Sequence, residues 1–191
     1  MMRRIAAGDM QALAWLYQRD ANKIMRYCLA VAHNEQLAAD ALQDTFVALA
    51  SAQTNGFDAS KGSLQGFLMG IARHQLLAAL RAGTKFVSLT GCEGDAQEFI
   101  EPLELATDAH NDLDPLRLQV ARQSTHALMA AVAQLPFAFR EVLVLIDLQE
   151  QSYEETAALT GVPLNTVRTR LHRARKRLAE QLAELSPKHG Q

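Results

Sequence analysis

The sequence predicts an all-α protein in which two small helical domains are joined by a flexible acidic linker. Of the 191 residues, 49% are hydrophobic but only 6% are aromatic, and most of the apolar residues are alanine and leucine, which favours helix over strand. Apolar residues recur at steps of three and four along most of the chain, the spacing of one helix face. Residues 90–115 lack this period and offer too little apolar surface to offset the entropy of ordering. We predict domains at 1–83 and 116–191, with the linker at 84–115.

Three helices are expected in the first domain. The first spans residues 9–33, the second begins near Glu35, and the third runs from about residue 64 to 81. Their apolar stripes are Leu13, Leu16, Tyr17, Ile24, Tyr27 and Val31 in the first, Leu42, Phe46 and Leu49 in the second, and Phe67, Leu68, Ile71, Leu76 and Leu80 in the third. Residues 51–63 are rich in turn-forming residues and break the pattern. The three stripes can share one core.

In the second domain, helices are expected from residue 116 to 134 and in the stretch "REVLVLIDL". Ser152 and Glu155 then have the spacing of a capping box, which predicts the start of a short helix. Gly161 is a suitable left-handed C-cap for that helix, and Pro163 suits the first turn of the next one. Helix, glycine turn and helix together form the pattern of a helix-turn-helix.

Charge is unevenly distributed along a chain whose net charge is −2. Eight acidic residues lie between residues 82 and 116, against Lys85 alone. The final predicted helix is basic instead, and its cations before Glu180 are Arg168, Arg170, Arg173, Arg175, Lys176 and Arg177. The acidic middle and the basic end therefore indicate separate roles.

The basic helix is amphipathic. Val167, Leu171, Ala174 and Leu178 share one stripe, while Thr169, His172, Arg173 and Lys176 fall largely on the other side and Arg168 lies at the flank. A charge run alone is more often a solvated surface. The capped helix and the turn that precede it favour DNA binding, with the cationic face in the major groove.

Several other function classes find no support in the sequence. Cys28 and Cys92 form no CxxC pair, so we expect reduced thiols. Asp9 and Gln11 interrupt any signal-peptide core, and no apolar run approaches the roughly 20 residues of a membrane span. The histidines show no metal-ligand spacing, and no phosphate-binding or nucleophile motif is present. We expect a soluble cytoplasmic protein that binds no metal, cofactor or small-molecule substrate and is not an enzyme.

Residues 135–178, "LPFAFREVLVLIDLQEQSYEETAALTGVPLNTVRTRLHRARKRL", resemble a known domain. It is the carboxyl-terminal promoter-binding domain of the extracytoplasmic-function (ECF) sigma factors of bacterial RNA polymerase, which belong to the sigma-70 family. Asn165 stands where that family commonly has glycine. The resemblance implies that this domain binds the −35 promoter element. The residues expected to contact DNA are Asn165, Thr166, Arg168, Thr169, His172, Arg173 and Lys176.

The amino-terminal half resembles the same family more loosely. Residues 38–52, "AADALQDTFVALASA", are similar to the helix that grips the polymerase core, which implies core contacts by Asp40, Gln43, Asp44 and Phe46. Residues 62–81 are similar to the helix that opens and reads the melted promoter, although Phe67, His74 and Ala78 replace the usual Trp, Asn and Asp. The residues expected at the −10 element are Asn55, Lys61, Ser63, Phe67, Arg73 and His74. Taken alone, Phe67 would more often be a core residue.

The resemblance implies an alternative sigma factor with three partners: core RNA polymerase, promoter DNA and a membrane-linked anti-sigma factor that silences it. In that family the acidic linker threads the polymerase toward its active centre. The alternative is a dimeric helix-turn-helix repressor whose amino-terminal helical domain senses a ligand. The long linker and the second resemblance favour the sigma factor.

Overall fold

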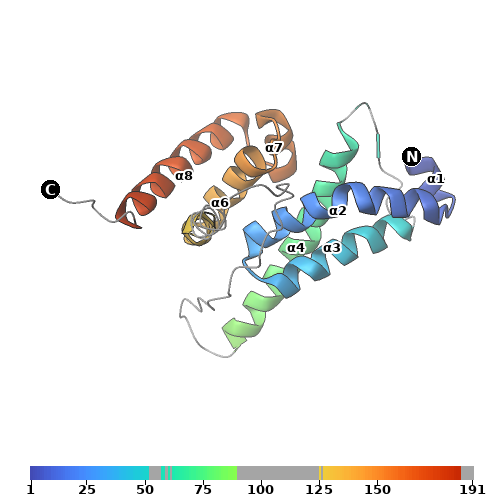
Figure 1. Ribbon diagram of the computed structural model, residues 1–191, viewed down its shortest axis with the longest axis horizontal. Coiled ribbons are helices and arrows are strands. Elements are labelled where there is room, and N and C mark those ends of the chain that lie inside the picture. The colour runs from blue at the N-terminus through green and yellow to red at the C-terminus, as the bar shows by residue number, and fades with distance from the viewer. Residues whose placement is uncertain (52–56, 59, 61, 90–124, 126, 186–191) are drawn as a thin grey trace, which may run out of the picture. The chain divides into compact units, whose positions relative to one another are not determined.

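The computed structural model describes residues 1–51, 57, 58, 60, 62–89, 125 and 127–185 (Figure 1). Every regular element in these ranges is a helix, which confirms the predicted all-α class. The chain divides into two compact units, of which the first contains α1 to α4 and the second contains α6 and α8.

The first unit is built from α1 (Met2–Ala6), α2 (Met10–Ala32), α3 (Glu35–Ala50) and α4 (Leu64–Leu89). Helix α2 packs on both α3 and α4, and α3 also packs on α4. The largest fully buried side chains of this unit are Leu16, Ile24, Tyr27, Val31, Leu49, Leu68, Met69 and Leu76. Most residues of the three predicted stripes therefore do face a common core. Tyr17 is 47% exposed, and the stripe residues that are only half-buried are Leu13, Leu42, Phe67, Ile71 and Leu80.

Side-chain caps set the starts of α2 and α3. The Asp9 carboxylate accepts hydrogen bonds from the backbone N–H groups of Gln11 and Ala12, each at 3.0 Å. The bond from Ala12, followed by that from Arg4, holds the pKa of Asp9 below its usual value, as expected for a carboxylate at a helix N-terminus. Asn34 caps α3 in the same way, accepting from the Leu37 N–H at 2.9 Å.

Two features of this unit differ from the sequence prediction. Helix α1 was not expected, because five residues are too short to show a helical period. Helix α4 continues to Leu89, beyond residue 83, where we predicted the first domain to end. Residues 82–89 contain no proline, and a single glycine, Gly83, is tolerated inside a helix at a cost of about 1 kcal/mol. The rest of the predicted linker and residues 116–124 lie outside the described residues.

Further along the chain, residues 127–133 are helical and precede α6 (Phe137–Leu143), α7 (Tyr153–Thr160) and α8 (Leu164–Leu185). The predicted capping box at α7 is confirmed. The Ser152 N–H donates to Glu155 Oε2 at 3.0 Å, and the Glu155 N–H donates to Ser152 Oγ at 3.1 Å. Gly161 follows α7 with φ +72°, the left-handed conformation that favours glycine there. The sharp turn between α7 and α8 is therefore encoded locally.

The stretch predicted as one continuous helix changes its winding at Val144. Residues Val144–Leu148 form a π-helical turn, η1, in which the Gln149 N–H donates to the Val144 carbonyl at 3.0 Å. A π turn accommodates one extra residue and rotates the side chains that follow. Asp147 lies in this turn and accepts a hydrogen bond from Arg175 Nε of α8 at 3.0 Å. The same carboxylate raises the pKa of Arg175.

The Asp147–Arg175 ion pair should contribute measurably but modestly to the stability of the second unit. The two side chains are 29% and 55% exposed, so solvent screening limits their coupling to about 0.5–1 kcal/mol. Asp147→Ala and Arg175→Ala should each destabilise the protein, and the double variant should be less destabilised than the sum of the two. Urea denaturation of the full chain, followed by circular dichroism, measures this cycle. Glu180→Ala, which removes the exposed partner of Lys176, is the control and should change stability little. Strict additivity of the two substitutions would contradict the pairing.

Candidate nucleic-acid interface

Helix α8 has one buried and one exposed side. Val167, Leu171 and Ala174 are 0%, 2% and 0% exposed, so the predicted apolar stripe packs against the unit. Among the residues predicted to contact the −35 element, Asn165, Arg168, Thr169, His172, Arg173 and Lys176 are exposed and Thr166 is half-buried. From residue 165 to 176 the helix rises by roughly 16 Å. This is long enough for several side chains to reach neighbouring base pairs in one major groove.

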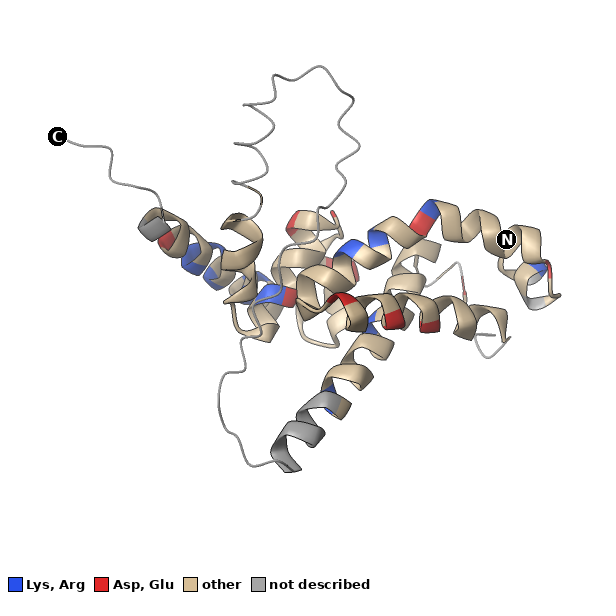
Figure 2. Ribbon diagram, turned by 60° about the horizontal axis from the view of Figure 1, so that its bottom comes forward, with Lys and Arg blue, Asp and Glu red and all other residues tan. Residues whose placement is uncertain are grey.

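The structure divides the basic cluster of α8 into two groups. Arg175 and Arg177 flank the buried stripe and hold the helix in place. Arg175 does so through its hydrogen bond to Asp147. The guanidinium of Arg177 lies 5.0 Å from the centre of the Phe139 ring. His172 and Arg173 have no ion-pair partner within the described ranges. Figure 2 shows the row of basic residues along α8. Sequence reasoning did not foresee that two of these cations serve the fold.

Three further contacts involve side chains on the exposed face. The Arg168 guanidinium lies 5.9 Å from the centre of the Tyr153 ring of α7, a distance at which a cation–π attraction is felt. The Thr169 hydroxyl donates to the Asn165 carbonyl at 2.9 Å, so that hydroxyl is already engaged within α8. The Lys176 Nζ is 3.9 Å from Glu180 Oε1, so that pair is loose and open to exchange.

The residues predicted to contact the −10 element cluster only in part. Ser63 is exposed, and its hydroxyl accepts from the Gly66 N–H at 3.0 Å at the start of α4. Phe67 is half-buried, with its ring centre 5.4 Å from that of Phe57. His74 lies on nearly the same helix face, whereas the spacing of Arg73 directs it about 120° away from Phe67. Asn55 and Lys61 lie outside the described residues.

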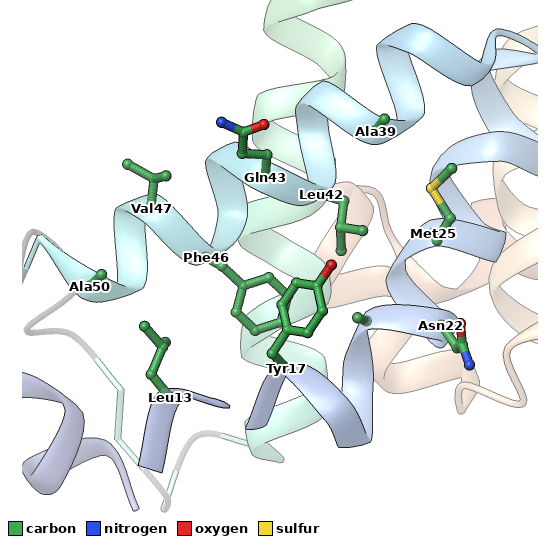
Figure 3. A pocket seen from close by; sticks show the side chains of 11 residues that line it. Leu13, Tyr17, Asn22, Met25, Ala39, Leu42, Gln43, Phe46, Val47 and Ala50 are labelled. Atoms are coloured by element: carbon green, nitrogen blue, oxygen red, sulfur yellow. The ribbon is translucent and has the colours of Figure 1, made fainter. Parts of the chain in front are cut away.

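A groove runs between α2 and α3 (Figure 3). It has a volume of about 630 Å³. Its lining residues are Leu13, Tyr17, Ala21, Asn22 and Met25 from α2, and Ala39, Leu42, Gln43, Phe46, Val47 and Ala50 from α3. Tyr17 and Phe46 meet across it, with ring centres 4.8 Å apart. Its walls are mostly apolar, and Val47 remains 55% exposed.

The residues predicted to contact the polymerase lie at this groove and beside it. Gln43 lines the groove, Asp40 and Asp44 are exposed on α3, and Phe46 is 7% exposed and faces Tyr17. The Gln36 side-chain amide donates to Asp40 Oδ1 at 2.8 Å, which holds that carboxylate at the surface. The sequence did not predict the contributions of Tyr17 and Val47. One sequence feature could have indicated this surface: Val47 is an apolar residue that lies next to the predicted apolar stripe of α3 and not on it.

The described part of the chain shows no group of three His, Cys, Asp or Glu side chains that could hold a metal ion. None of its helices is long and apolar enough to cross a bilayer. Cys28 is buried, and burial raises the pKa of its thiol to about 12. That thiol stays protonated at neutral pH and is a poor nucleophile.

Comparison with known proteins identifies both units. The family model for sigma-70 region 2 matches residues 16–86, and the model for sigma-70, region 4 matches residues 125–178. The ECF RNA polymerase sigma factor SigE of Mycolicibacterium smegmatis is 29% identical over 189 residues, which are 97% of this chain and 68% of SigE. The ECF sigma factor SigM of Mycobacterium tuberculosis is 30% identical over 182 residues, which are 94% of this chain and 82% of SigM.

Two solved structures share the fold. Sigma factor RpoE in complex with the anti-sigma factor NepR, from Bartonella quintana, superposes with a TM-score of 0.68 at 24% identity, over 91% of this chain and 98% of RpoE. CnrH in complex with the cytosolic domain of CnrY gives a TM-score of 0.60 at 23% identity, over 97% of this chain and 96% of CnrH. Both sigma-70 regions are matched, and a relative is 30% identical over most of both chains; this chain therefore belongs to the ECF sigma factors of the sigma-70 family.

Proposed function

We propose that this chain, as an alternative sigma factor of the cytoplasm, binds core RNA polymerase through α3 and reads a promoter through α4 and α8. The observation that carries the proposal is that α8 has two kinds of basic residue, those that contact its own unit and those that are exposed. Arg175 and Arg177 fix the helix to its own unit, while the side from Asn165 to Lys176 is exposed. A helix held in this way presents its polar side chains to a groove at little cost in conformational entropy.

At the −35 element the exposed face offers two kinds of contact. Arg173 can donate two parallel hydrogen bonds to a guanine edge, the commonest specific contact in the major groove. Lys176 and Arg168 flank it with cations suited to phosphates, which position the helix without reading sequence. The Thr169 hydroxyl is engaged by the Asn165 carbonyl, so the methyl group of this exposed residue is suited to contact with the methyl group of a thymine.

At the −10 element the start of α4 provides an aromatic and polar surface. Ser63, Phe67 and His74 lie along one face of the helix, and the half-buried Phe57 packs beside Phe67. Stacking on aromatic rings together with edge hydrogen bonds is the usual way to hold unpaired bases. We assign the melted strand to this face of α4.

Polymerase binding is assigned to the groove and the carboxylates beside it. Asp40 and Asp44 are exposed next to apolar walls that include Tyr17 and Val47. This combination suits an amphipathic helix whose apolar side fills the groove and whose basic side chains pair with the two carboxylates.

We further propose that an anti-sigma protein, linked to the membrane, covers the same groove and keeps the chain from polymerase. The solved structure of RpoE contains the anti-sigma factor NepR, and that of CnrH contains the cytosolic domain of CnrY. A partner that occupies the groove between α2 and α3 competes directly with polymerase, so its release activates the chain by mass action.

A ligand-sensing dimeric repressor is less well supported. A sensor domain buries most of its ligand in an enclosed cavity. The groove of the first unit instead has exposed walls, since Tyr17 is 47% and Val47 is 55% exposed.

The assignment of α8 predicts a loss of −35 binding in the double variant Arg168→Ala/Arg173→Ala. The loss at a base-reading arginine should be about 1–3 kcal/mol, or roughly five-fold to 150-fold in affinity. DNase footprinting of the reconstituted holoenzyme measures it. Ala179→Ser is the control, because Ala179 is an exposed position of α8 beyond the predicted DNA-contact residues and its substitution should leave the footprint unchanged. Undiminished −35 protection in the double variant would rule the assignment out.

The assignment of α3 predicts that Asp40→Lys/Asp44→Lys abolishes assembly with core polymerase. Both positions are exposed, so helicity by circular dichroism should not change. Glycerol-gradient co-sedimentation with core enzyme is the measurement, and Glu35→Lys, an exposed charge reversal in the first turn of α3, is the control. The assignment is wrong if the double variant competes normally for core enzyme.

The proposed inhibitor predicts a small stoichiometric partner that depends on the groove. A pull-down from the native cell should recover it with the wild-type chain before stress and lose it afterwards. The variant Val47→Asp should fail to retain it under either condition, because a charge would be buried against the partner's apolar side. Recovery of polymerase subunits alone under every condition would refute the idea of an inhibitor.

A further inference from the structure

Asn165 is the first exposed residue of α8, and it lies on the side of the helix that faces away from its own unit. Around the helix axis it stands about 160° from the buried Val167 and within about 40° of Thr169 and Lys176, both of which are exposed. In a helix-turn-helix, residues at the amino-terminal end of the second helix contact base edges in the major groove. Asn165 is therefore placed at the end of the exposed face that enters the groove.

The fold makes no use of the Asn165 amide. Within the described ranges the side chain of this residue forms no hydrogen bond, and only its backbone carbonyl is engaged, by the Thr169 hydroxyl. Helix α8 begins at Leu164, so the cap position belongs to Pro163 and the amide does not serve as an N-cap. Asparagine is also one of the weaker helix formers. Helix formation therefore gives no reason for an asparagine at this position.

The backbone that carries this amide is held on both sides. The Pro163 carbonyl accepts hydrogen bonds from the N–H groups of Thr166 and Val167 at 2.8 and 3.1 Å, and Val167 is fully buried. The Thr169 hydroxyl holds the Asn165 carbonyl itself at 2.9 Å. An asparagine side chain has only two torsions left to fix, so the entropy lost when the amide binds a ligand is small.

We propose that Asn165 reads an adenine within the −35 element. Its Nδ2 group donates to adenine N7 and its Oδ1 accepts from the adenine N6 amino group, a pair of bonds that the major-groove edges of the other three bases do not offer. Glycine, common in the family at this position, has no side chain for this contact. The adenine lies about 12 Å along α8 from Arg173, or roughly three to four base pairs from the guanine assigned to that arginine. The inference rests on the proposed function, because it takes α8 to lie in the major groove.

Base preference, measured position by position, tests the proposal. Reconstituted holoenzyme is bound to a pool of promoter fragments randomised across the −35 element, and the bound fragments are sequenced. The wild-type chain should prefer an A·T pair at one position by roughly five-fold to 150-fold. Asn165→Ala should lose this preference and keep those at the other positions, while Arg173→Ala should lose a different one. The alanine variant retains the backbone carbonyl that Thr169 contacts, so its helicity by circular dichroism should not change.

Two further variants separate base reading from other roles. Asn165→Asp keeps the size of the side chain but lacks the donor to N7, so the preference should move from adenine towards cytosine, whose amino group a carboxylate accepts. Lys176→Ala, at a phosphate contact, should instead weaken binding alike for all sequences and reduce the slope of log affinity against log salt by about one. A uniform loss of this kind in Asn165→Ala, an unchanged base pattern, or a preference for another base at the position that Asn165 controls would overturn this inference alone. A wild-type holoenzyme without any sequence preference across the −35 element would overturn the proposed function instead.

Discussion

The seating of α8 is the constraint on which the rest of the second unit depends. Val167, Leu171 and Ala174 are buried, and arginines on both flanks, Arg175 and Arg177, tie the helix to Asp147 and to the Phe139 ring. Rotation of α8 by even one residue, about 100°, would bury cations and expose the apolar stripe. One rotational setting is therefore strongly favoured, and it determines which polar side chains can reach a major groove.

The first unit combines a partly exposed apolar groove with a buried core. Leu16, Ile24 and Tyr27 are fully buried, so the packing of α2 does not rely on the residues that line the α3 groove. Tyr17 and Val47 can then remain open to a partner helix. Cations and an indole occupy another side of α2, so one long helix separates the apolar side that lines the groove from a polar, aromatic one.

Local signals explain why much of the architecture was predictable from sequence. The capping box at Ser152 and the glycine at 161 act within a few residues, so the turn before α8 could be recognised from the chain alone. The π turn at Val144 could not, because nothing in the local sequence marks its extra residue, and the Asp147–Arg175 pair that forms there joins residues far apart in the sequence. The same holds for the basic cluster: charge counting gives six cations, but only packing separates those that hold the fold from those that face outward. The groove was missed for a related reason, since it exists only where the side chains of α2 and α3 leave a gap.

The central claim is that this chain confers promoter specificity on core RNA polymerase, and in vitro transcription tests it most directly. Core enzyme alone and core enzyme with the purified chain would be compared on a library of promoter fragments from the native genome, with run-off transcripts as the measurement. The account predicts discrete transcripts, from a subset of promoters that share −35 and −10 sequences, only when the chain is present. Transcripts unchanged by the chain, although it is folded by circular dichroism, would contradict the account.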